Sequence, residues 1–339
     1  MALGYGVLVG VPVRTDRVFL GLFGLYWLLL AGNYLVTRTE PLLLYVLVTP
    51  IAVGATVVVL PEFIEDDRML FTKLIVVLSV VLTIIGVAML AMETRTEQEL
   101  FTYVGDSVLG YEGYRIISLF DYWNTYGFMM MVGFLSTLYV YLEERRPVWA
   151  LCLVVVFVGL VLSDGDASYV GVGAGGLVLV AGYSLYALAG FLILGAFGAG
   201  AMLWTGQLQT LLESGLTGRV LLWEASIRRL QDDPYVGIGF KDNAAEIYPY
   251  SDWPNPAGTH NSYIHILLNT GVIAGTVYLL ALGYGALRSF WIVSSTWDLY
   301  VVGTLTAILV HMCFESVTLG GLSMTSVFLG LYLGLGLRN

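Results

Sequence analysis

Apolar stretches of about 20 residues, each long enough to cross a bilayer as a helix, recur along most of this chain. The hydrocarbon core of a bilayer is about 30 Å thick, and only helices and closed barrels satisfy their backbone hydrogen bonds inside it. Charged residues make up only 12% of the 339 residues, and hydrophobic residues make up 58%. Soluble domains carry roughly 25% charged residues. We therefore expect an all-α fold, a polytopic membrane helical bundle.

The apolar runs predict about ten transmembrane helices. We place them near 18–36, 42–60, 70–92, 119–142, 148–163, 169–186, 187–204, 262–287, 299–315 and 319–337. The sixth and seventh come from one run, Tyr169 to Trp204, which is too long for one crossing, so we expect a tight reversal near Leu188. The predicted organisation is an N-terminal bundle of about seven spans at 1–204, a large loop at 205–261 and a C-terminal bundle of about three spans at 262–339.

The basic residues predict which side of the membrane each loop occupies, because short cytoplasmic loops carry an excess of Arg and Lys. With the N-terminus inside, the inner flanks hold Arg14, Arg17, Arg68, Lys73, Arg145, Arg146, Arg288 and Arg338, and the short outer loops hold Arg38, Arg95 and Arg115. Eight inner residues against three outer ones favour this orientation. It predicts a multi-pass protein of the plasma (inner) membrane with the 205–261 loop on the extracytoplasmic side. The net charge of −10 argues against a nucleic-acid partner.

A helix is expected at the start of the polar part of this loop. Apolar residues recur there at helical spacing, at Val220, Trp223, Ile227 and Leu230, and Asp232-Asp233-Pro234 follows them. We predict an amphipathic helix at the outer membrane face, with Thr217 as a possible N-cap and Arg219 in the first turn. An arginine at that position can hold a phosphate through its planar fork of donors, or it can simply contact lipid headgroups.

His260 ends the loop, and Asn261 and Ser262 after it are candidate N-caps of the next span. An imidazole at this boundary can accept a proton from an attacking sugar hydroxyl, and the alternative is a structural hydrogen bond. His265 lies about 140° further around the helix, so the two histidines are poorly placed to share zinc. Gly237 and Gly239 after Pro234 indicate irregular backbone that approaches a ligand or another helix closely, or an ordinary turn.

Taken in order, these motifs resemble those of a known family. Thr217-Gly218-Arg219, Trp223, Pro234, Gly237-x-Gly239, His260-Asn261-Ser262-Tyr263 and Gly271-x-x-x-Gly275 are similar to the loop of the O-antigen ligase and polymerase superfamily of C-type membrane glycosyltransferases. The resemblance implies that His260 is the general base or acceptor orienter and that Arg219 stabilises the phosphate leaving group. It implies substrate-binding roles for Trp223, Gly237, Gly239 and Asn261.

A shorter similarity lies at Arg115 to Gly127, where the family has an arginine followed by an asparagine before a helix. It implies that Arg115 is a second cation on the donor phosphates and that Asn124 contacts substrate, although the usual Asn-Pro-Asn is here Trp123-Asn124-Thr125. The loop that usually carries a Ser-Arg pair reads Ser163-Asp164-Gly165-Asp166. Asp164-x-Asp166 also resembles the metal-binding pair of other C-type glycosyltransferases, which implies a cation-dependent reaction as an alternative, although most such pairs are solvated turns.

Two features inside the spans are open to interpretation. His311 and Glu315 are four residues apart, so one helix face should carry both, either lining the path of the acceptor or forming a structural pair. Glycines between Gly171 and Gly176 lie in an apolar span and predict close helix packing rather than a dinucleotide loop.

The function implied by the resemblance is transfer of a saccharide from an isoprenoid phosphate or diphosphate donor to a sugar, lipid or protein hydroxyl. The expected reaction is inverting and uses no metal or other cofactor, and the expected partners are the lipid-linked donor, the acceptor and membrane lipids. The alternative is a transporter or flippase of lipid-linked saccharides, which also needs many spans. The chain shows no internal repeat of the kind that alternating access commonly uses.

Overall fold

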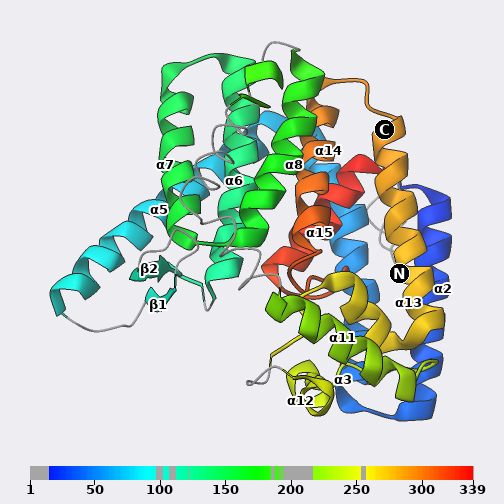
Figure 1. The fold of residues 1–339 in the computed structure, drawn as a ribbon. Helices are drawn as coiled ribbons and strands as arrows, with labels where there is room; N and C mark the ends of the chain where they lie inside the picture. Colours follow the sequence, from blue (N-terminus) through cyan, green and yellow to red (C-terminus); the bar gives the residue numbers. More distant parts are fainter. Residues whose placement is uncertain are drawn as a thin grey trace. The chain divides into compact units, whose positions relative to one another are not determined.

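The computed structural model describes residues 15–96, 102–106, 112–120, 122–184, 188–190, 192–193, 217–252 and 257–338. These residues are mostly helical (Figure 1). Five helical runs in them are long and apolar enough to cross a membrane, namely Arg17–Thr37, Glu40–Asp66, Arg68–Met92, Trp123–Glu144 and Ser262–Trp291. Two shorter apolar helices are Pro147–Ser163 and Met324–Gly336. The chain is accordingly an integral membrane protein, as the hydropathy predicts.

Each predicted span within the described residues overlaps a helix, although the ends differ by several residues; α14, for example, ends at His311 and not at residue 315. Helix α2 (Arg17–Thr37) matches the first predicted span, and α5 (Arg68–Thr96), α6 (Trp123–Glu144) and α7 (Pro147–Ser163) match the third to the fifth. Helices α8 (Asp166–Tyr183), α13 (Ser262–Trp291), α14 (Thr296–His311) and α15 (Met324–Gly336) match the sixth and the last three. The seventh span, at 187–204, and the reversal near Leu188 fall largely outside the described residues.

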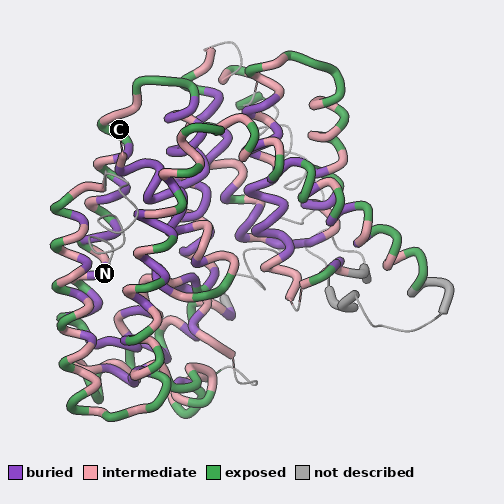
Figure 2. The backbone as a smooth tube through the Cα atoms, turned by 180° about the vertical axis from the view of Figure 1, so that it is seen from behind, coloured by how far each residue is buried: buried purple, intermediate pink, exposed green. Residues whose placement is uncertain are grey.

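Many large apolar residues of these helices are exposed, the opposite of what water would favour. Figure 2 shows the exposed residues as green segments along the helices. On α5, for example, Leu74 is 59% exposed and Val77 is 54% exposed. Exposed apolar residues in such numbers mark a membrane or protein contact, and along helices of bilayer length they fit contact with lipid.

The chain divides into two compact units. The first contains residues 1–65, 214–293 and 312–339. In it α2 packs against α13 and α3 (Glu40–Val53), with Tyr26 and Tyr278 in edge-to-face contact at 5.1 Å. A π-helical turn, η1 (Gly54–Val59), follows α3 and leads into α4 (Leu60–Asp66). Helix α15 packs on η1 through Gly330 and Gly334, where a β-carbon would overlap Thr56 and the backbone of Val57.

The same unit contains the polar loop. Helix α11 (Thr217–Asp232) is followed by α12 (Asn243–Ile247) and the short 3-10 turn η3 (Tyr248–Tyr250). One buried face of α11, formed by Leu222 and Ala225, packs with Ile238, Ile247 and Leu268. The loop therefore has a small core of its own, which fixes the start of α11 relative to α13.

The second unit contains residues 66–213 and 294–311. Helices α8 and α14 pack very closely, because a β-carbon on Gly175 would overlap the carbonyl oxygen of Gly303. The prediction that these glycines serve helix packing is confirmed for Gly171 and Gly175, whereas nothing lies within 4 Å of a β-carbon on Gly173. The unit also holds an antiparallel hairpin, β1 (Thr102–Asp106) and β2 (Glu112–Ile116), in which Tyr103 pairs with Arg115. The expectation of an all-α chain missed this hairpin, because its strands are too short to form a period-2 pattern distinct from their polar surroundings.

Candidate active site

Arg219 is held near the start of α11, as the sequence predicts. The helix begins at Thr217 and ends at Asp232, directly before Asp233-Pro234, so Arg219 lies in its first turn. Val220 and Ile227, which belong to the apolar pattern, are 41% and 47% exposed, whereas Leu222 and Ala225 on another face of the helix are buried. The burial of Leu222 and Ala225 turns Arg219 toward the segment that follows α14, where its guanidinium lies 5.6 Å from the ring of Phe314.

The glycines of the loop serve a backbone contact with α13. Helix α13 is interrupted at Gly271, which has φ 76° and ψ 168°, a conformation that is essentially restricted to glycine. The interruption leaves the carbonyl groups of Leu268 and Asn269 free to accept hydrogen bonds from the N–H groups of Ile238 and Gly239, at 2.9 and 3.0 Å.

A second contact completes this junction. The N–H of Val272 donates to the carbonyl of Pro234 at 2.7 Å, and a β-carbon on Gly237 would lie 2.7 Å from the nitrogen of Gly271. Of the alternatives for Gly237 and Gly239, the structure supports close approach to a helix. Asn33 from α2 also donates to the carbonyl of Thr270 at 2.7 Å, which anchors the break to the neighbouring helix.

His260 precedes α13 in a left-handed conformation, with φ 44°. The side chain of the next residue, Asn261, caps the helix by accepting from the N–H groups of Tyr263 and Ile264, both at 3.0 Å, which confirms the predicted N-cap. The same Asn261 donates to the carbonyl of Cys313 at 3.0 Å. The start of α13 is thus joined to the segment that follows α14.

Ser262 strengthens this junction. Its N–H donates to the carbonyl of Met312 at 2.9 Å, and its hydroxyl donates to the carbonyl of Glu315 at 2.6 Å. The hydroxyl in turn accepts from the N–H of Val317 at 2.7 Å. These bonds hold Glu315 beside His260, although 54 residues lie between them in the sequence.

One carboxylate brings the two predicted catalytic residues of this unit together. Oε1 of Glu315 lies 3.9 Å from Nη2 of Arg219, and Oε2 lies 3.5 Å from Nδ1 of His260. The side chains are partly shielded from solvent, with exposed fractions of 18% for Arg219, 30% for His260 and 11% for Glu315. A cation, a potential base and an acid therefore share a half-buried site, where charge interactions are stronger than in bulk water.

The predicted placement of Glu315 is wrong. Helix α14 ends at His311, and Glu315 lies in the turn after it, so the two residues do not share a helix face. The backbone of residues 312–317 does not continue the helix. It forms hydrogen bonds with Asn261 and Ser262 instead.

Trp223 lies in the middle of α11, and its indole N–H is buried without a hydrogen-bond partner among the described residues. A buried donor of this kind is costly unless a ligand or water satisfies it. Trp223 therefore remains a candidate for substrate contact, as the resemblance implies.

Arg115, the third predicted catalytic residue, belongs to the second unit. It lies one residue before the end of strand β2, and its Nε donates to Oδ2 of Asp164 at 2.9 Å. Its guanidinium also lies 5.3 Å from the ring of Trp123. Trp123 and Asn124 are the first two residues of α6. Asp164 is the C-cap of α7 and is only 7% exposed, and Asp166 begins α8. Among the described residues, no group of three or more His, Cys, Asp or Glu side chains could hold a metal ion.

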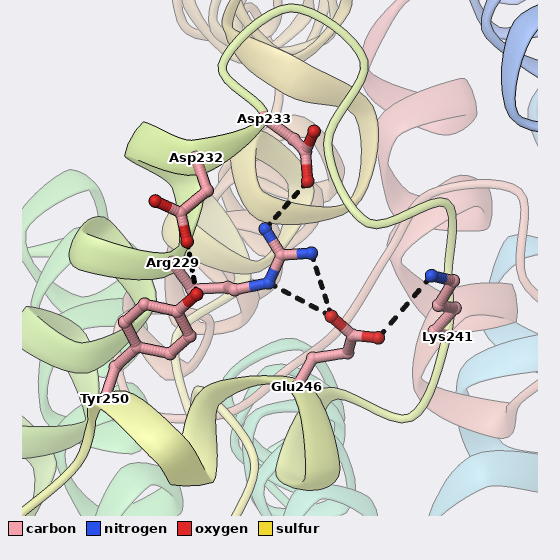
Figure 3. Close-up of polar contacts among 6 residues, drawn as sticks. All are labelled: Arg229, Asp232, Asp233, Lys241, Glu246 and Tyr250. Atoms are coloured by element: carbon pink, nitrogen blue, oxygen red, sulfur yellow. Dashed lines mark hydrogen bonds and ion pairs between the residues drawn. The ribbon is translucent and has the colours of Figure 1, made fainter.

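A polar cluster that we did not predict from the sequence lies at the C-terminal end of α11 (Figure 3). Arg229 donates from Nε to Glu246 at 3.0 Å and from Nη1 to Asp233 at 2.9 Å, and Lys241 lies 3.6 Å from Glu246. The hydroxyl of Tyr250 donates to Asp232. Apart from Lys241, the residues of this cluster border an open cleft of about 450 Å³. The pair of Arg229 and Asp233, with its i,i+4 spacing, was the one signal in the sequence that could have indicated it.

Electrostatics show that the cluster is held by charge pairing. Burial alone would lower the pKa of Arg229, but its hydrogen bonds to Asp233 and Glu246 outweigh burial and raise it. The hydrogen bond to Asp232 raises the pKa of Tyr250. The cluster therefore ties the end of α11 to α12 and η3, which stabilises the loop that carries Arg219 and His260.

Comparison with known proteins agrees with the motifs of the loop. Residues 125–279 match the family model described as O-antigen ligase, and the matched part includes Arg219, Trp223 and His260. Comparisons with curated proteins and with solved structures gave no match. The similarity to the O-antigen ligase and polymerase superfamily is thereby confirmed, while Arg115 and Glu315 lie outside the matched residues.

Proposed function

Because residues 125–279 match the O-antigen ligase family, we propose that this integral membrane protein is a glycosyltransferase of the O-antigen ligase or polymerase type. Its donor is a saccharide linked to an isoprenoid phosphate or diphosphate. Its acceptor is a hydroxyl group of a sugar, a lipid or a protein, and the reaction takes place at the outer face of the plasma membrane. The observation that carries the proposal is the convergence of Arg219 and His260 on Glu315 in one half-buried site.

In the proposed reaction His260 acts as general base. It removes the proton from the acceptor hydroxyl while that oxygen attacks the anomeric carbon of the donor sugar. The bond between this carbon and the phosphate oxygen breaks, and the phosphate leaves with the electron pair. A single displacement of this kind inverts the anomeric configuration. The proton carried by His260 then passes to water or to the released phosphate.

Arg219 is proposed to stabilise the leaving phosphate. Charge grows on the phosphate as the glycosidic bond breaks, and a preorganised guanidinium in a partly dry site can neutralise it without a metal ion. The aromatic ring of Phe314 beside the guanidinium supports its orientation. Arg115 stays a proposed second phosphate ligand, and Trp223 and Asn124 stay proposed substrate contacts, on the strength of the sequence resemblance.

The test is transfer by the purified protein in lipid nanodiscs, supplied with the lipid-linked saccharide fraction of the source cells. His260→Ala should lower turnover roughly 10²–10⁴-fold, the usual contribution of general acid–base catalysis. The matched controls are Glu224→Gln and Arg228→Ala, because these two side chains form an exposed pair on the same helix α11 and should not affect transfer. Wild-type protein that transfers no saccharide, or a His260→Ala variant at full rate, would contradict the proposal.

A further inference from the structure

The carboxylate of Glu315 divides its two oxygens between the two catalytic candidates of the first unit. Oε2 faces Nδ1 of His260 at 3.5 Å, and Oε1 faces Nη2 of Arg219 at 3.9 Å. The nitrogen that faces the carboxylate is Nδ1, not Nε2. The other ring nitrogen is therefore the one left for chemistry.

The position of Glu315 is fixed by its backbone, independently of these charges. Its carbonyl accepts the Ser262 hydroxyl at 2.6 Å, and that hydroxyl also accepts the N–H of Val317. Asn261, directly after His260, holds the neighbouring carbonyl of Cys313. Because Asn261 and Ser262 follow His260 directly and hydrogen-bond to the segment that contains Glu315, the backbones of His260 and Glu315 are held beside each other.

A neutral imidazole carries its proton on only one of its two nitrogens, and a base needs the other nitrogen free. A carboxylate beside Nδ1 favours the tautomer with the proton on Nδ1 and leaves Nε2 as the acceptor. This is the arrangement by which an acid orients a catalytic histidine elsewhere. The gap of 3.5 Å is long for a hydrogen bond, but such contacts are often long without substrate and shorten in the reacting complex.

From this geometry we propose that Glu315 is a positioning residue: it holds His260 in the tautomer protonated on Nδ1, with Nε2 available to the acceptor hydroxyl. The proposal deepens the function given above and rests on it, since it needs His260 to be the base. Nη2 of Arg219 faces the same carboxylate at 3.9 Å, and the planar guanidinium carries five N–H donors with which it can also hold a phosphate.

The tautomer can be measured without any substrate. The chain has only three histidines, His260, His265 and His311, so nitrogen-15 labelling of histidine gives three pairs of ring signals. The pair of His260 is identified by its loss in His260→Ala. At a pH where this ring is neutral, the wild-type protein in nanodiscs should show a protonated Nδ1 and an unprotonated Nε2.

Removing the carboxylate should change that population. In Glu315→Ala the protonated Nε2 form of His260 should increase, and in the control Glu224→Ala, an exposed residue of α11, it should not. If Glu315→Ala does not fold, Glu315→Gln keeps the size of the side chain and removes its charge, and the Nε2 form should still increase relative to wild type. A wild-type ring protonated on Nε2, or an unchanged ring in the Glu315 variants, would overturn the proposal.

The second measurement is a double-mutant cycle on transfer. Glu315→Ala should lower turnover by at least about tenfold, the scale on which a residue that orients a functional histidine acts. If Glu315 acts through His260, adding Glu315→Ala to His260→Ala should cost little more, because the side chain it orients is already gone. Fully additive losses would overturn the proposal.

The two measurements separate the possible failures. An unaffected turnover in His260→Ala would refute the proposed base and with it the positioning role, even if the tautomer depended on Glu315. An unchanged tautomer with a large loss in His260→Ala would leave the proposed function standing and refute Glu315 alone.

Discussion

Gly271 and Tyr235 touch through their backbones. A β-carbon on Gly271 would overlap the carbonyl group of Tyr235, so only glycine allows the loop after α11 to rest against the break in α13. The break exposes carbonyl groups that the loop then satisfies through Ile238 and Gly239. Because His260 lies directly before the N-cap of α13, this contact positions the loop after α11 against the helix that follows the proposed base.

The first prediction follows from that contact. Gly271→Ala should lower the stability of the protein by at least about 1–3 kcal/mol, because it combines a disfavoured backbone conformation with a steric overlap. Gly283→Ala is the matched control in the same helix, where nothing lies within 4 Å of an added β-carbon, and it should not destabilise. Thermal unfolding of both variants in nanodiscs measures the difference. Equal midpoints would show that the break in α13 is not required.

The second prediction concerns the geometry of Arg219. Arg219→Ala should lower kcat/KM roughly 10²–10³-fold, the usual cost of removing one donor to a developing charge. Arg219→Lys should not restore activity, because a lysine keeps the charge without the planar fork or the stacking on Phe314. The control pair is Arg228→Ala and Arg228→Lys on the exposed side of α11. Full activity in Arg219→Lys would reduce the role of Arg219 to diffuse charge.

The third prediction tests the orientation in the membrane. After replacement of Cys152 and Cys313 by alanine, Asp252→Cys in the polar loop should react with an impermeant thiol reagent in intact cells. Arg146→Cys, in the exposed turn between α6 and α7, should react only after lysis. Both positions are solvent-exposed, so accessibility alone does not distinguish them. The opposite labelling pattern would invert the orientation and move the proposed site to the cytoplasm.

The fourth prediction is a pH dependence at the N-cap of α2. Asp16 accepts from the N–H groups of Val18 and Phe19, and Tyr284 and Arg288 of α13 contact it. Burial acts to raise the pKa of Asp16, but these hydrogen bonds and the guanidinium together lower it below its ordinary value. Because the pKa of Asp16 is lower in the folded state, its carboxylate stabilises the fold at every pH above the pKa of an unfolded aspartate, about 3.9.

That contribution is lost as the pH falls through the folded-state pKa. Wild type should therefore be more stable than Asp16→Asn at pH 6, and the difference should shrink as the pH falls below about 4. Asparagine keeps the cap, so Asp16→Ala should be less stable than Asp16→Asn by about 0.5–2 kcal/mol. Unfolding midpoints of the three proteins across this pH range provide the measurement, and a constant difference between wild type and Asp16→Asn would contradict it.

Much of the fold follows from hydropathy because membrane helices satisfy their own backbone hydrogen bonds, so an apolar run of sufficient length already specifies a helix. The break at Gly271 does not follow, because hydropathy continues across it unchanged. It depends on hydrogen bonds from Ile238 and Gly239, which the order of glycines indicates only as a close approach.

The candidate site shows the same limit. Arg219 and His260 could be recognised because each lies at a helix start with a local motif. The prediction that Glu315 lies beside His311 is wrong, because their spacing suggests a shared helix face. The position of Glu315 depends instead on hydrogen bonds from Asn261 and Ser262, more than 50 positions earlier in the chain. Hydrogen bonds between backbone segments far apart in the chain leave no periodic pattern in the sequence. The ion pair of Arg115 with Asp164 was also missed, because two side chains 49 positions apart leave no local pattern either.

The last prediction separates arginine-based catalysis from metal catalysis. Asp164 already holds the guanidinium of Arg115 at 2.9 Å in a nearly buried position, so a divalent cation there would have to compete with a positive charge in place. We therefore expect transfer to be insensitive to chelator and Asp166→Ala to retain activity, while His260→Ala loses it roughly 10²–10⁴-fold. If Asp164 and Asp166 instead held a catalytic cation, chelator and Asp166→Ala would each abolish transfer, and His260→Ala would stay largely active. Nanodisc preparations of the wild type and both variants, each assayed with and without chelator, distinguish the two reactions, because they assign opposite outcomes to every one of these measurements.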